Sequence, residues 1–401
     1  MIEYIISISV SLFIIGLVRR LSSQKGLIFW LFAILSILPP VIVAGVRDFS
    51  IGTDVESYVT TNFGWAGVYN NFFDYNNYIY SLNGNYGWTQ FGPVHQTEFG
   101  YNVLVYFISR FTTDPHWLLF SIQFIISLFV LLSVVKISKT FGVSMLWQMF
   151  IYYFTFYLFG LNIMRQYMAA AIMLWAILLF VERKYWAYLV FQIIAISFHI
   201  TSLIGIIIVI LWWCSLERSK LTNYKSAFFK TVIFVAIIAV FGGRILLLIE
   251  NIASLIPYLR YHLSSLDVTG GYVFRRMLVY ILPGITIIFL ISLSELRGAK
   301  SNNLDVIQER LVKFIVSLTL VGITLNTLYL FQNVIPRFAV YFDVFRIIGF
   351  ILIIDRFKSN YRFVMLVITT FLGFGIFGYI LYSGNGELFP YSSNILKELL
   401  Q

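Results

Sequence analysis

Residues 27–58 read LIFWLFAILSILPPVIVAGVRDFSIGTDVESY, and this stretch sets the class of the whole chain. Its first part is a continuous apolar run, long enough to cross a hydrocarbon core roughly 30 Å thick. Directly after the run come one cation and three carboxylates: Arg47, Asp48, Asp54 and Glu56. The stretch therefore predicts a membrane-spanning helix and then a charged turn where the chain leaves the bilayer.

The rest of the chain repeats the apolar pattern. Of its 401 residues, 60% are hydrophobic and only 11% are charged, whereas about a quarter are charged in a soluble globular protein. A membrane β-barrel would show alternating segments of ~10 residues instead. We therefore expect an all-α polytopic integral membrane protein, a single transmembrane domain over residues 1–401 with about twelve crossings. The expected spans are 2–18, 27–46, 117–135, 145–161, 166–181, 185–198, 200–214, 229–249, 277–293, 311–330, 338–355 and 363–382.

Basic residues order the topology. When Arg19, Arg20 and Lys25 are placed in the cytoplasm by the positive-inside rule, every later cytoplasmic loop is also basic and both termini lie outside. These loops account for the net charge of +10 without a nucleic-acid partner. The first segment lacks the charged start and cleavage site of a signal peptide, so we expect it to be a retained helix.

Two outer-face loops follow from this topology. The longer one covers residues 47–116 and includes an apolar segment at 100–111 that is too short to span, so we expect an interfacial helix there. The second loop covers residues 250–276. Residues 60–98 are rich in Tyr, Phe, Trp and Asn, a composition that suits saccharide binding but also occurs in the aromatic belt of membrane proteins.

The apolar stretch 185–214 predicts a hairpin. As one helix it would be about 45 Å long, which exceeds the membrane thickness. Basic residues at both of its ends also require an even number of crossings. We therefore expect two short helices with a turn near Phe198 and His199, which places His199 toward the outer side.

The basic residues assigned to the outer side, or to the outer halves of helices, are arginines apart from Lys397. A guanidinium matches the geometry of phosphate and keeps its charge when it is partly buried. This bias indicates a phosphate or pyrophosphate ligand on the outer side. The residues are Arg47, Arg110, Arg165, Arg244, Arg260, Arg275, Arg276, Arg337, Arg346 and Lys397.

The turn after the first quoted run allows two interpretations. Thr53 and Glu56 have the spacing of a capping box, which would start a helix near Asp54. Arg47 and free amides near a helix start would form an anion site, with Asp48 and Asp54 orienting the arginine or accepting a sugar hydroxyl. An ordinary capped helix with a surface ion pair is the alternative.

Further candidates lie at the outer ends of other helices. Arg165 precedes small residues that allow close helix packing, and a charge at that depth is usually functional. His199, with an unperturbed pKa of about 6.5 for histidine, is suited to accept a hydroxyl proton. Arg275 and Arg276 can clamp a diphosphate or merely snorkel to the interface. Asp343 and Arg346 have the spacing of a structural pair.

Several common chemistries find no motif here. The chain has no GxxxxGK[ST] loop, no HExxH helix and no G-x-S-x-G elbow. Its single cysteine, Cys214, excludes an intramolecular disulfide and a cysteine metal cluster. A metal held by Asp48 and Asp54 has weak support, because arginines can already neutralise a phosphate. We expect no cofactor and no metal.

Five motifs occur together in one order: AGVRDFSIGTDVESY at 44–58, TEFGYNVL at 97–104, NIMRQYMAAAI at 162–172, SFHITSLI at 197–204 and PRFAVYFDVF at 336–345. In these motifs the chain resembles the EpsG family, a branch of the Wzy-type polymerases of bacterial O-antigens, capsules and exopolysaccharides. The resemblance spans nearly the whole chain. The 60–96 insertion and the 250–276 loop match no motif of the family, and we expect them to hold specificity for the repeat unit.

The resemblance implies a metal-independent GT-C-like glycosyltransferase in the bacterial cytoplasmic (inner) membrane, with its active site facing outward. Its donor is a growing glycan on undecaprenyl diphosphate, and a lipid-linked repeat unit is the acceptor. A chain-length regulator and a flippase of the same pathway are candidate partners. An O-antigen ligase or another GT-C enzyme, and a lipid-linked oligosaccharide flippase, remain alternatives.

Site residues follow from matching the motifs. The implied catalytic residues are His199, Arg165, Asp54 and Glu98. The implied substrate-binding residues are Arg47, Asp48, Thr53, Tyr58, Gln166, Arg275, Arg276 and Arg337. Arg165 and Arg337 are expected to hold the donor diphosphate, with Arg47 assisting or binding the acceptor diphosphate. His199, or an acid among Glu98 and Asp54, is expected to take the proton.

Overall fold

Helices make up nearly all of the described chain, as the apolar runs predict. The structure is a computed structural model that describes residues 1–18, 26–81, 87–89, 92–94, 96–217, 233, 270–296, 306–328 and 335–400. Contacts divide the chain into unit 1, Met1–Gly205 with Gly373–Gln401, and unit 2, Ile206–Leu372. Each unit is described by itself, and the single transmembrane domain over 1–401 stays a prediction.

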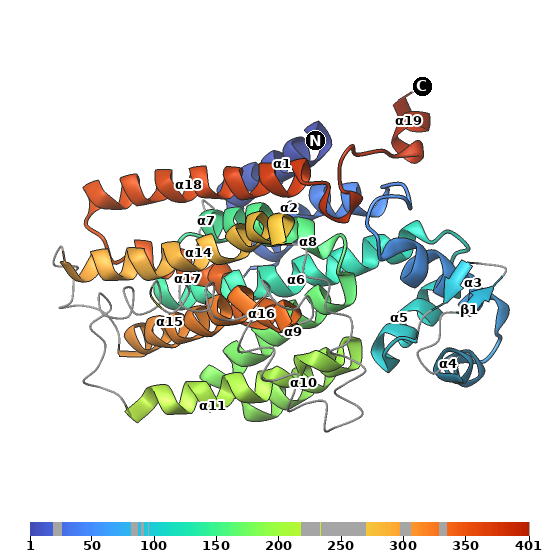
Figure 1. The fold of residues 1–401 in the computed structure, drawn as a ribbon, viewed down its shortest axis with the longest axis horizontal. Helices are drawn as coiled ribbons and strands as arrows, with labels where there is room; N and C mark the ends of the chain where they lie inside the picture. The colour runs from blue at the N-terminus through green and yellow to red at the C-terminus, as the bar shows by residue number, and fades with distance from the viewer. Residues whose placement is uncertain are drawn as a thin grey trace. The chain divides into compact units, whose positions relative to one another are not determined.

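The elements of unit 1 can be followed by colour in Figure 1. In chain order they are α1 (Ile2–Val18), α2 (Leu27–Gly45), the π-helical turn η1 (Glu56–Thr60), α3 (Thr61–Val68), α4 (Phe72–Ser81), β1 (Gly87–Thr89), β2 (Gly92–Val94), α5 (Phe99–Ser109), α6 (His116–Phe141), α7 (Met145–Tyr152), the π-helical turn η2 (Tyr153–Tyr157), α8 (Leu158–Gly160), α9 (Met164–Val181), α10 (Tyr185–Phe198), the 3₁₀ turn η3 (Ile200–Leu203), the 3₁₀ turn η6 (Asn385–Glu387) and α19 (Asn394–Leu400). Helices α11 (Ile204–Glu217) and α18 (Ser359–Tyr382) run from one unit into the other.

Helix α9 is the core of unit 1. Helices α6 and α10 pack on α9, and α2 packs on α1 and α6. The three alanines that follow the first turn of α9, Ala169, Ala170 and Ala171, are fully buried. Such small side chains let neighbouring helices approach closely, which suits packing in a bilayer. The close packing fixes the start of α9, where Arg165 lies.

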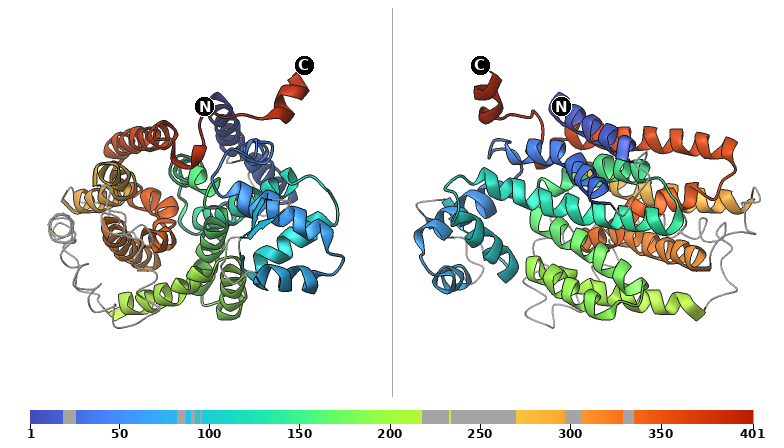
Figure 2. Two further views of the ribbon diagram at one scale, coloured as in Figure 1. Left: turned by 45° about the vertical axis from the view of Figure 1, so that its right-hand side comes forward. Right: turned by 180° about the vertical axis from the view of Figure 1, so that it is seen from behind.

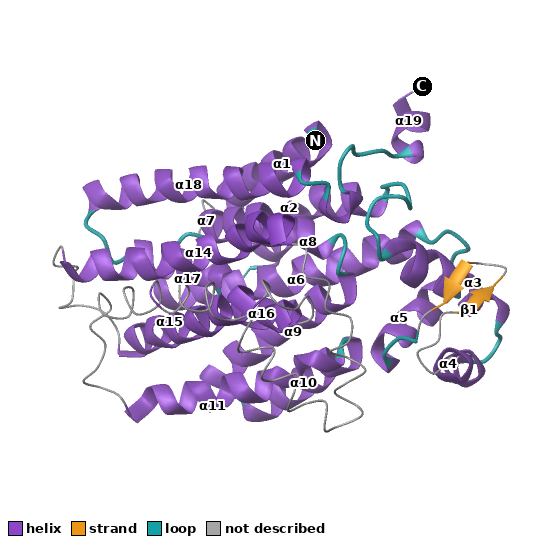
Figure 3. Cartoon of the chain, viewed as in Figure 1, coloured by secondary structure: helices purple, strands orange, loops and turns teal. Residues whose placement is uncertain are grey.

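Helices α3, α4 and α5 lie together beyond one end of α6 (Figures 1 and 2). The antiparallel pair β1–β2 lies against α3 (Figure 3), and it adds a short strand pair to the predicted all-α architecture. The described parts of residues 47–116 contain short helices and the strand pair, and the assignment of this range to an outer-face loop stays a prediction. Helix α5 has an exposed apolar face of Phe99, Val103 and Phe107, as an interfacial helix requires, although its place in the membrane stays a prediction.

The described helices support a membrane protein and leave the number of crossings as a prediction. Five of them are long and apolar enough to span: Leu27–Gly45, His116–Phe141, Met164–Val181, Ile307–Thr327 and Ser359–Tyr382. Shorter apolar helices coincide with several of the other predicted spans, the first of them Ile2–Val18. The predicted span at 229–249 and the basic residues at 19–25 lie outside the described residues, apart from position 233 in that span.

The predicted hairpin over 185–214 is confirmed at its turn. Helix α10 ends at Phe198, and His199 adopts an extended conformation with φ −159° and ψ 120°. The chain then folds back on α10, as shown by the hydrogen bond that Gln192 Nε2 donates to Ser202 O at 2.7 Å. A side chain at Gly205 would collide with Gln192, so the glycine permits this close return.

The predicted capping box is wrong. The helical segment does begin close to Asp54, but η1 has no side-chain cap. The Thr53 hydroxyl donates instead to Asn162 Oδ1 at 2.7 Å. At Gly52, with φ 99°, the chain turns so that Thr53 lies against the turn before α9, and its hydroxyl bonds there instead of capping η1.

In unit 2 the described helices are α14 (Gly270–Leu296), α15 (Val306–Thr327), α16 (Ile335–Asp343) and α17 (Arg346–Ile354). Helix α15 packs on α14, α16 and α17. The span predicted at 338–355 is broken between α16 and α17. At the break Arg346 Nη2 and Asp343 Oδ1 are 2.5 Å apart, so the predicted structural pair is confirmed.

Candidate active site

Three side chains that the sequence predicts to be catalytic meet at one place in unit 1. Glu98 directly precedes α5, Arg165 lies in the first turn of α9, and His199 lies between α10 and η3. Arg165 Nη1 donates to Glu98 Oε2, and His199 Nδ1 is 3.8 Å from Glu98 Oε1. We call these residues the Glu98–Arg165–His199 cluster. Its side chains are 15–21% exposed, so a ligand can reach them.

A glycine allows the cluster to form. A Cβ atom at Gly100 would lie 2.8 Å from Ser197 O, a distance that real Cβ atoms essentially never show. Without it, the start of α5 can rest on the end of α10. Glu98 Oε1 then accepts a hydrogen bond from Ile200 N at 3.4 Å, so the carboxylate joins the ends of α9 and α10.

Two tyrosines support the guanidinium of Arg165. Its Cζ lies 4.1 Å from the centre of the Tyr58 ring and 5.8 Å from that of Tyr101. Tyr101 in turn donates to Tyr58 O at 2.7 Å. Burial raises the pKa of both phenols, and the Arg165 charge opposes this effect only in part. Both rings stay neutral and provide a cation–π support, worth about 0.5–2 kcal/mol.

The imidazole of His199 is oriented by Thr201. Its Nδ1 lies 3.3 Å from Thr201 N, which donates to it, and 2.8 Å from Thr201 Oγ1. The distance of 3.8 Å to Glu98 Oε1 is too long for a hydrogen bond. Thr201 therefore fixes the plane of the ring, with Nε2 on the side away from Thr201. A fixed ring suits a residue that exchanges a proton with a bound group.

Arg47 lies deeper than the cluster. It is 1% exposed, and its guanidinium donates to three backbone carbonyls: Ala44 O at 2.6 Å, Leu161 O at 2.9 Å and Ile51 O at 3.2 Å. Burial lowers the pKa of Arg47, but an arginine remains charged in a protein. The predicted role of Arg47 in substrate binding stays a prediction, and its present bonds tie the main chain together.

The other predicted residues of the 44–58 motif contact the chain around them. Asp48 Oδ1 accepts from Asn394 N at 2.9 Å, and Asp48 N donates to Ser392 O at 3.0 Å. Asp54 lies in the turn before η1, where its carbonyl accepts from Tyr58 N at 3.0 Å. Gln166 is buried beside Arg165 in the chain. The structure leaves the functional roles of these residues as predictions.

Three further arginines predicted to bind substrate, Arg275, Arg276 and Arg337, belong to unit 2. Arg337 is exposed in the first turn of α16. Arg275 and Arg276 lie in α14, and their side chains are outside the described part of the chain. The same holds for nearly all of the predicted 250–276 loop. Their roles stay predictions.

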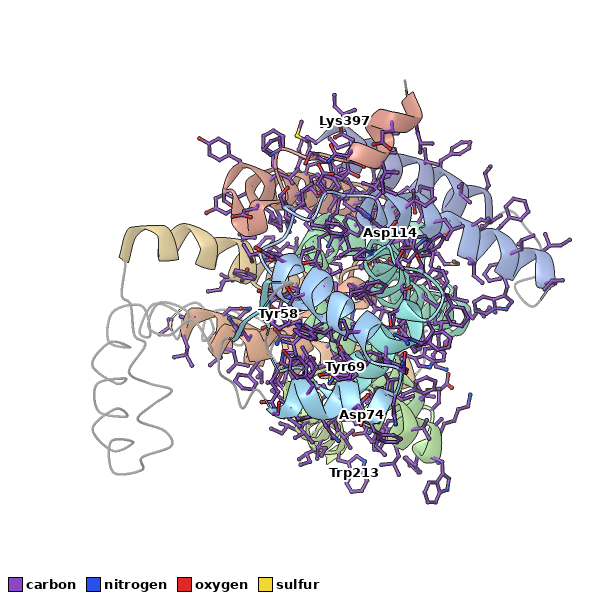
Figure 4. The ribbon with its side chains drawn as sticks, turned by 90° about the vertical axis from the view of Figure 1, so that its right-hand side faces the viewer. Tyr58, Tyr69, Asp74, Asp114, Trp213 and Lys397 are labelled. Atoms are coloured by element: carbon purple, nitrogen blue, oxygen red, sulfur yellow. The ribbon has the colours of Figure 1, made fainter. Side chains whose placement is uncertain are left out.

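Several aromatic side chains of the 60–98 region are partly accessible, whereas some of its asparagines form hydrogen bonds within the loop. The ring centres of Trp65 on α3, Tyr69 directly after α3 and Tyr78 on α4 lie 4.6–6.4 Å apart, and all three side chains are half-buried. Figure 4 faces this end of the unit and labels Tyr69 together with Tyr58 and Asp74. In contrast, Asn62 and Asn76 hydrogen-bond to Thr97 and Asn102. Part of the asparagine content therefore serves the fold of the loop.

Sequence reasoning missed Tyr101 and Thr201, which support Arg165 and His199. Both lie within quoted motifs, three residues after Glu98 and two residues after His199. Thr201 could have been found, because a hydroxyl two residues after a candidate can bond back to it at the start of a helix. Tyr101 could not, because its partners Arg165 and Tyr58 come from other segments. Among the described residues, no group of three or more His, Cys, Asp or Glu side chains could hold a metal ion.

The family model for the EpsG family matches residues 28–393. The chain belongs to the EpsG family. Membership of the EpsG family indicates a polymerase-type function in the synthesis of an exopolysaccharide or O-antigen, and the apolar helices indicate a membrane-embedded protein. Neither the comparison with curated proteins nor that with solved structures found a match.

Proposed function

We propose that this EpsG-family protein is a polysaccharide polymerase of the outer face of the bacterial cytoplasmic membrane. It transfers a growing glycan from undecaprenyl diphosphate to a hydroxyl of a lipid-linked repeat unit. The observation that carries this proposal is the Glu98–Arg165–His199 cluster, which sets an arginine, a carboxylate and a histidine side by side where α5, α9 and α10 meet, with 15–21% of each side chain exposed. The family match supports the class of reaction.

The reaction requires stabilisation of a developing negative charge and removal of a proton, and the cluster can provide both. The acceptor oxygen forms a bond to the anomeric carbon of the donor glycan, and the bond from that carbon to the diphosphate oxygen breaks. Negative charge then grows on the departing undecaprenyl diphosphate, and the acceptor hydroxyl loses its proton. A preorganised cation stabilises the first change, and a base within reach takes the proton.

Arg165 is the proposed partner of the donor diphosphate. Glu98 bonds to Nη1, and a guanidinium carries five N–H donors, so the same side chain can also donate to phosphate oxygens. Glu98 and the Tyr58 ring hold it in one orientation. Arg337, Arg275 and Arg276 are proposed to contribute further phosphate contacts.

His199 is the proposed proton acceptor. For Nε2 to receive the acceptor proton, Nδ1 must carry the imidazole proton and donate it to Thr201 Oγ1 at 2.8 Å, instead of accepting from Thr201 N. Glu98 and Asp54 are the alternative bases. The reaction is proposed to need no metal, because arginines supply the positive charge. A chain-length regulator and a flippase of the same pathway are proposed partners.

Polymerisation by purified protein with a lipid-linked repeat unit tests the proposal. We expect Arg165→Ala and His199→Ala to abolish long chains, and the matched variant Arg110→Ala to keep them. Arg110 is an exposed arginine at the end of α5, stacked on Tyr106 and outside the cluster. Normal chain lengths from Arg165→Ala or His199→Ala would contradict the assignment.

A deletion strain separates the rival functions. A polymerase deletion leaves single repeat units on the terminal acceptor, whereas loss of all attached sugar indicates a ligase. Lipid-linked units that accumulate on the cytoplasmic face indicate a flippase.

A further inference from the structure

Arg47 is enclosed by main chain. It is 1% exposed, and Nε, Nη1 and Nη2 each donate to a different backbone carbonyl, with Met164 Sδ 3.6 Å from Nη2. A buried charge is tolerated only where hydrogen bonds replace its lost hydration. If Arg47 turned away to bind a phosphate, it would leave these carbonyls without their donor.

The three carbonyls come from different parts of the chain. Ala44 is in the last turn of α2, Ile51 is in the turn that follows, and Leu161 is in the turn before α9. Leu161 is 114 residues from Arg47 in the sequence, but it lies in the turn that leads directly into the start of α9, where Arg165 lies. The guanidinium therefore connects the end of α2 to the segment from which Arg165 projects.

Two neighbours of Arg47 hold the same segment. Thr53 Oγ1 donates to Asn162 Oδ1 at 2.7 Å. A Cβ atom at Gly52 would lie 2.8 Å from Leu161 O, so the main chain approaches this carbonyl as closely as a glycine allows. Residues 161–164 are thus held by Arg47, Gly52 and Thr53 together.

We propose that Arg47 is a positioning residue that acts on the reaction through Arg165. It fixes residues 161–164, from which α9 begins, and so places the Arg165 guanidinium between Glu98 and the Tyr58 ring. The effect on rate rests on the proposed function, because it requires Arg165 to contact the substrate. The fixing of residues 161–164 does not rest on it, and the two parts are tested separately.

Hydrogen–deuterium exchange tests the structural part. Arg47→Lys keeps the positive charge but replaces a planar fork with one ammonium group. We expect faster exchange of the amides in residues 161–167 in Arg47→Lys and unchanged exchange in α6 and α10. The matched control is Tyr391→Phe, which removes a 2.9 Å hydrogen bond to Val43 O at the end of α2 without touching residues 161–164. Unchanged exchange of residues 161–167 in Arg47→Lys overturns the proposal.

Polymerisation rates of folded variants test the catalytic part. Arg47→Lys is expected to lower kcat about 10²-fold, the size of effect that a small misplacement of a catalytic group produces. Gly52→Ala leaves Arg47 in place but pushes on Leu161, and it is expected to lower kcat in the same way. Adding Arg47→Lys to Arg165→Lys is expected to lower the rate by less than about threefold more, because the two changes act on one group.

The outcomes separate the two proposals. If wild-type protein does not polymerise a lipid-linked repeat unit, the proposed function fails, and the exchange result still decides the role of Arg47 in the fold. If wild-type protein polymerises, but Gly52→Ala is fully active and the two Arg→Lys effects multiply to about 10⁴-fold, Arg47 contacts substrate itself. That result overturns the positioning role.

Discussion

Two arginine–carboxylate pairs, Arg165–Glu98 in unit 1 and Arg346–Asp343 in unit 2, use the same chemistry in different surroundings. Arg165 and Glu98 are 67 residues apart in the chain and 15% and 21% exposed. Arg346 and Asp343 are three apart and 7% and 14% exposed. The first pair adjoins His199 and an aromatic ring. The second is closed in by helices.

Enclosure is what distinguishes the two pairs. Arg346 Nη1 donates to Tyr280 O at 2.7 Å, and Asp343 Oδ2 accepts from Asn326 at 2.7 Å. A Cβ atom at Gly284 would lie 2.9 Å from Arg346 Nη2, so a missing side chain makes room for the guanidinium. The Arg346–Asp343 pair joins α14, α15, α16 and α17, whereas a ligand can reach the Arg165–Glu98 pair.

The largest expected effect is on the enclosed Arg346–Asp343 pair, which we call the closed pair. Asp343→Ala leaves Arg346 as a buried charge without its carboxylate, which we expect to lower the free energy of unfolding by about 3–5 kcal/mol. Thermal unfolding in detergent measures this effect. The matched control is Asp355→Ala, which breaks a more exposed pair with Arg362 and should cost about 0–1 kcal/mol. Equal losses from the two variants would show that enclosure does not distinguish the pairs.

Substitutions in the more exposed Arg165–Glu98 pair, which we call the open pair, are expected to lower activity rather than stability. Arg165→Lys keeps the charge but loses the fork, and we expect kcat for polymerisation to fall about 10²–10³-fold, with little change in the unfolding midpoint. Arg110→Lys serves as the control. A drop in the unfolding midpoint as large as that of Asp343→Ala would make Arg165–Glu98 a structural pair as well.

A smaller effect is expected from a substitution at Gly100, which lets the start of α5, and with it Glu98, pack against α10. Gly100→Ala places a Cβ atom against Ser197 O, so α5 must shift on α10 and carry Glu98 with it. We expect a loss of stability of about 1–3 kcal/mol and a fall in polymerisation rate of at least tenfold, about what a small displacement causes. Gly67→Ala in α3, where an added Cβ meets nothing within 4 Å, should leave the polymerisation rate unchanged and raise stability by at most about 1 kcal/mol. Full activity in Gly100→Ala would show that the position of Glu98 does not matter.

The smallest expected effect concerns the orientation of His199. Thr201→Val removes the hydroxyl at 2.8 Å from Nδ1 and keeps the backbone N–H donor. The loss of one hydrogen bond corresponds to about 0.5–1.5 kcal/mol, so we expect kcat to fall about two- to tenfold while KM changes little. Thr201→Ser keeps the hydroxyl and should restore the rate. If Thr201→Ser is as slow as Thr201→Val, the hydroxyl is not what orients the ring.

Much of the fold follows from local properties of the chain. The apolar runs predict helices because only a helix satisfies its own backbone in hydrocarbon. The break at His199 follows from the length of the 185–214 stretch and the basic residues at its ends. The strand pair β1–β2 and the division of the 338–355 span into α16 and α17 were not predicted. The strands depend on pairing with each other, and the helix break coincides with the Asp343–Arg346 pair.

The sequence by itself determined the membrane class, the hairpin turn at His199 and the charged residues near the ends of apolar segments, because bilayer thickness and the cost of burying charge act on every segment separately. Only the tertiary structure decided how those charges are used. Arg47 and Arg165 look alike in sequence, yet Arg47 donates to carbonyls as far as Leu161 and Arg165 to the Glu98 carboxylate. A guanidinium bonds to whatever acceptors lie within about 3 Å, and those acceptors come from segments that meet only when the chain folds.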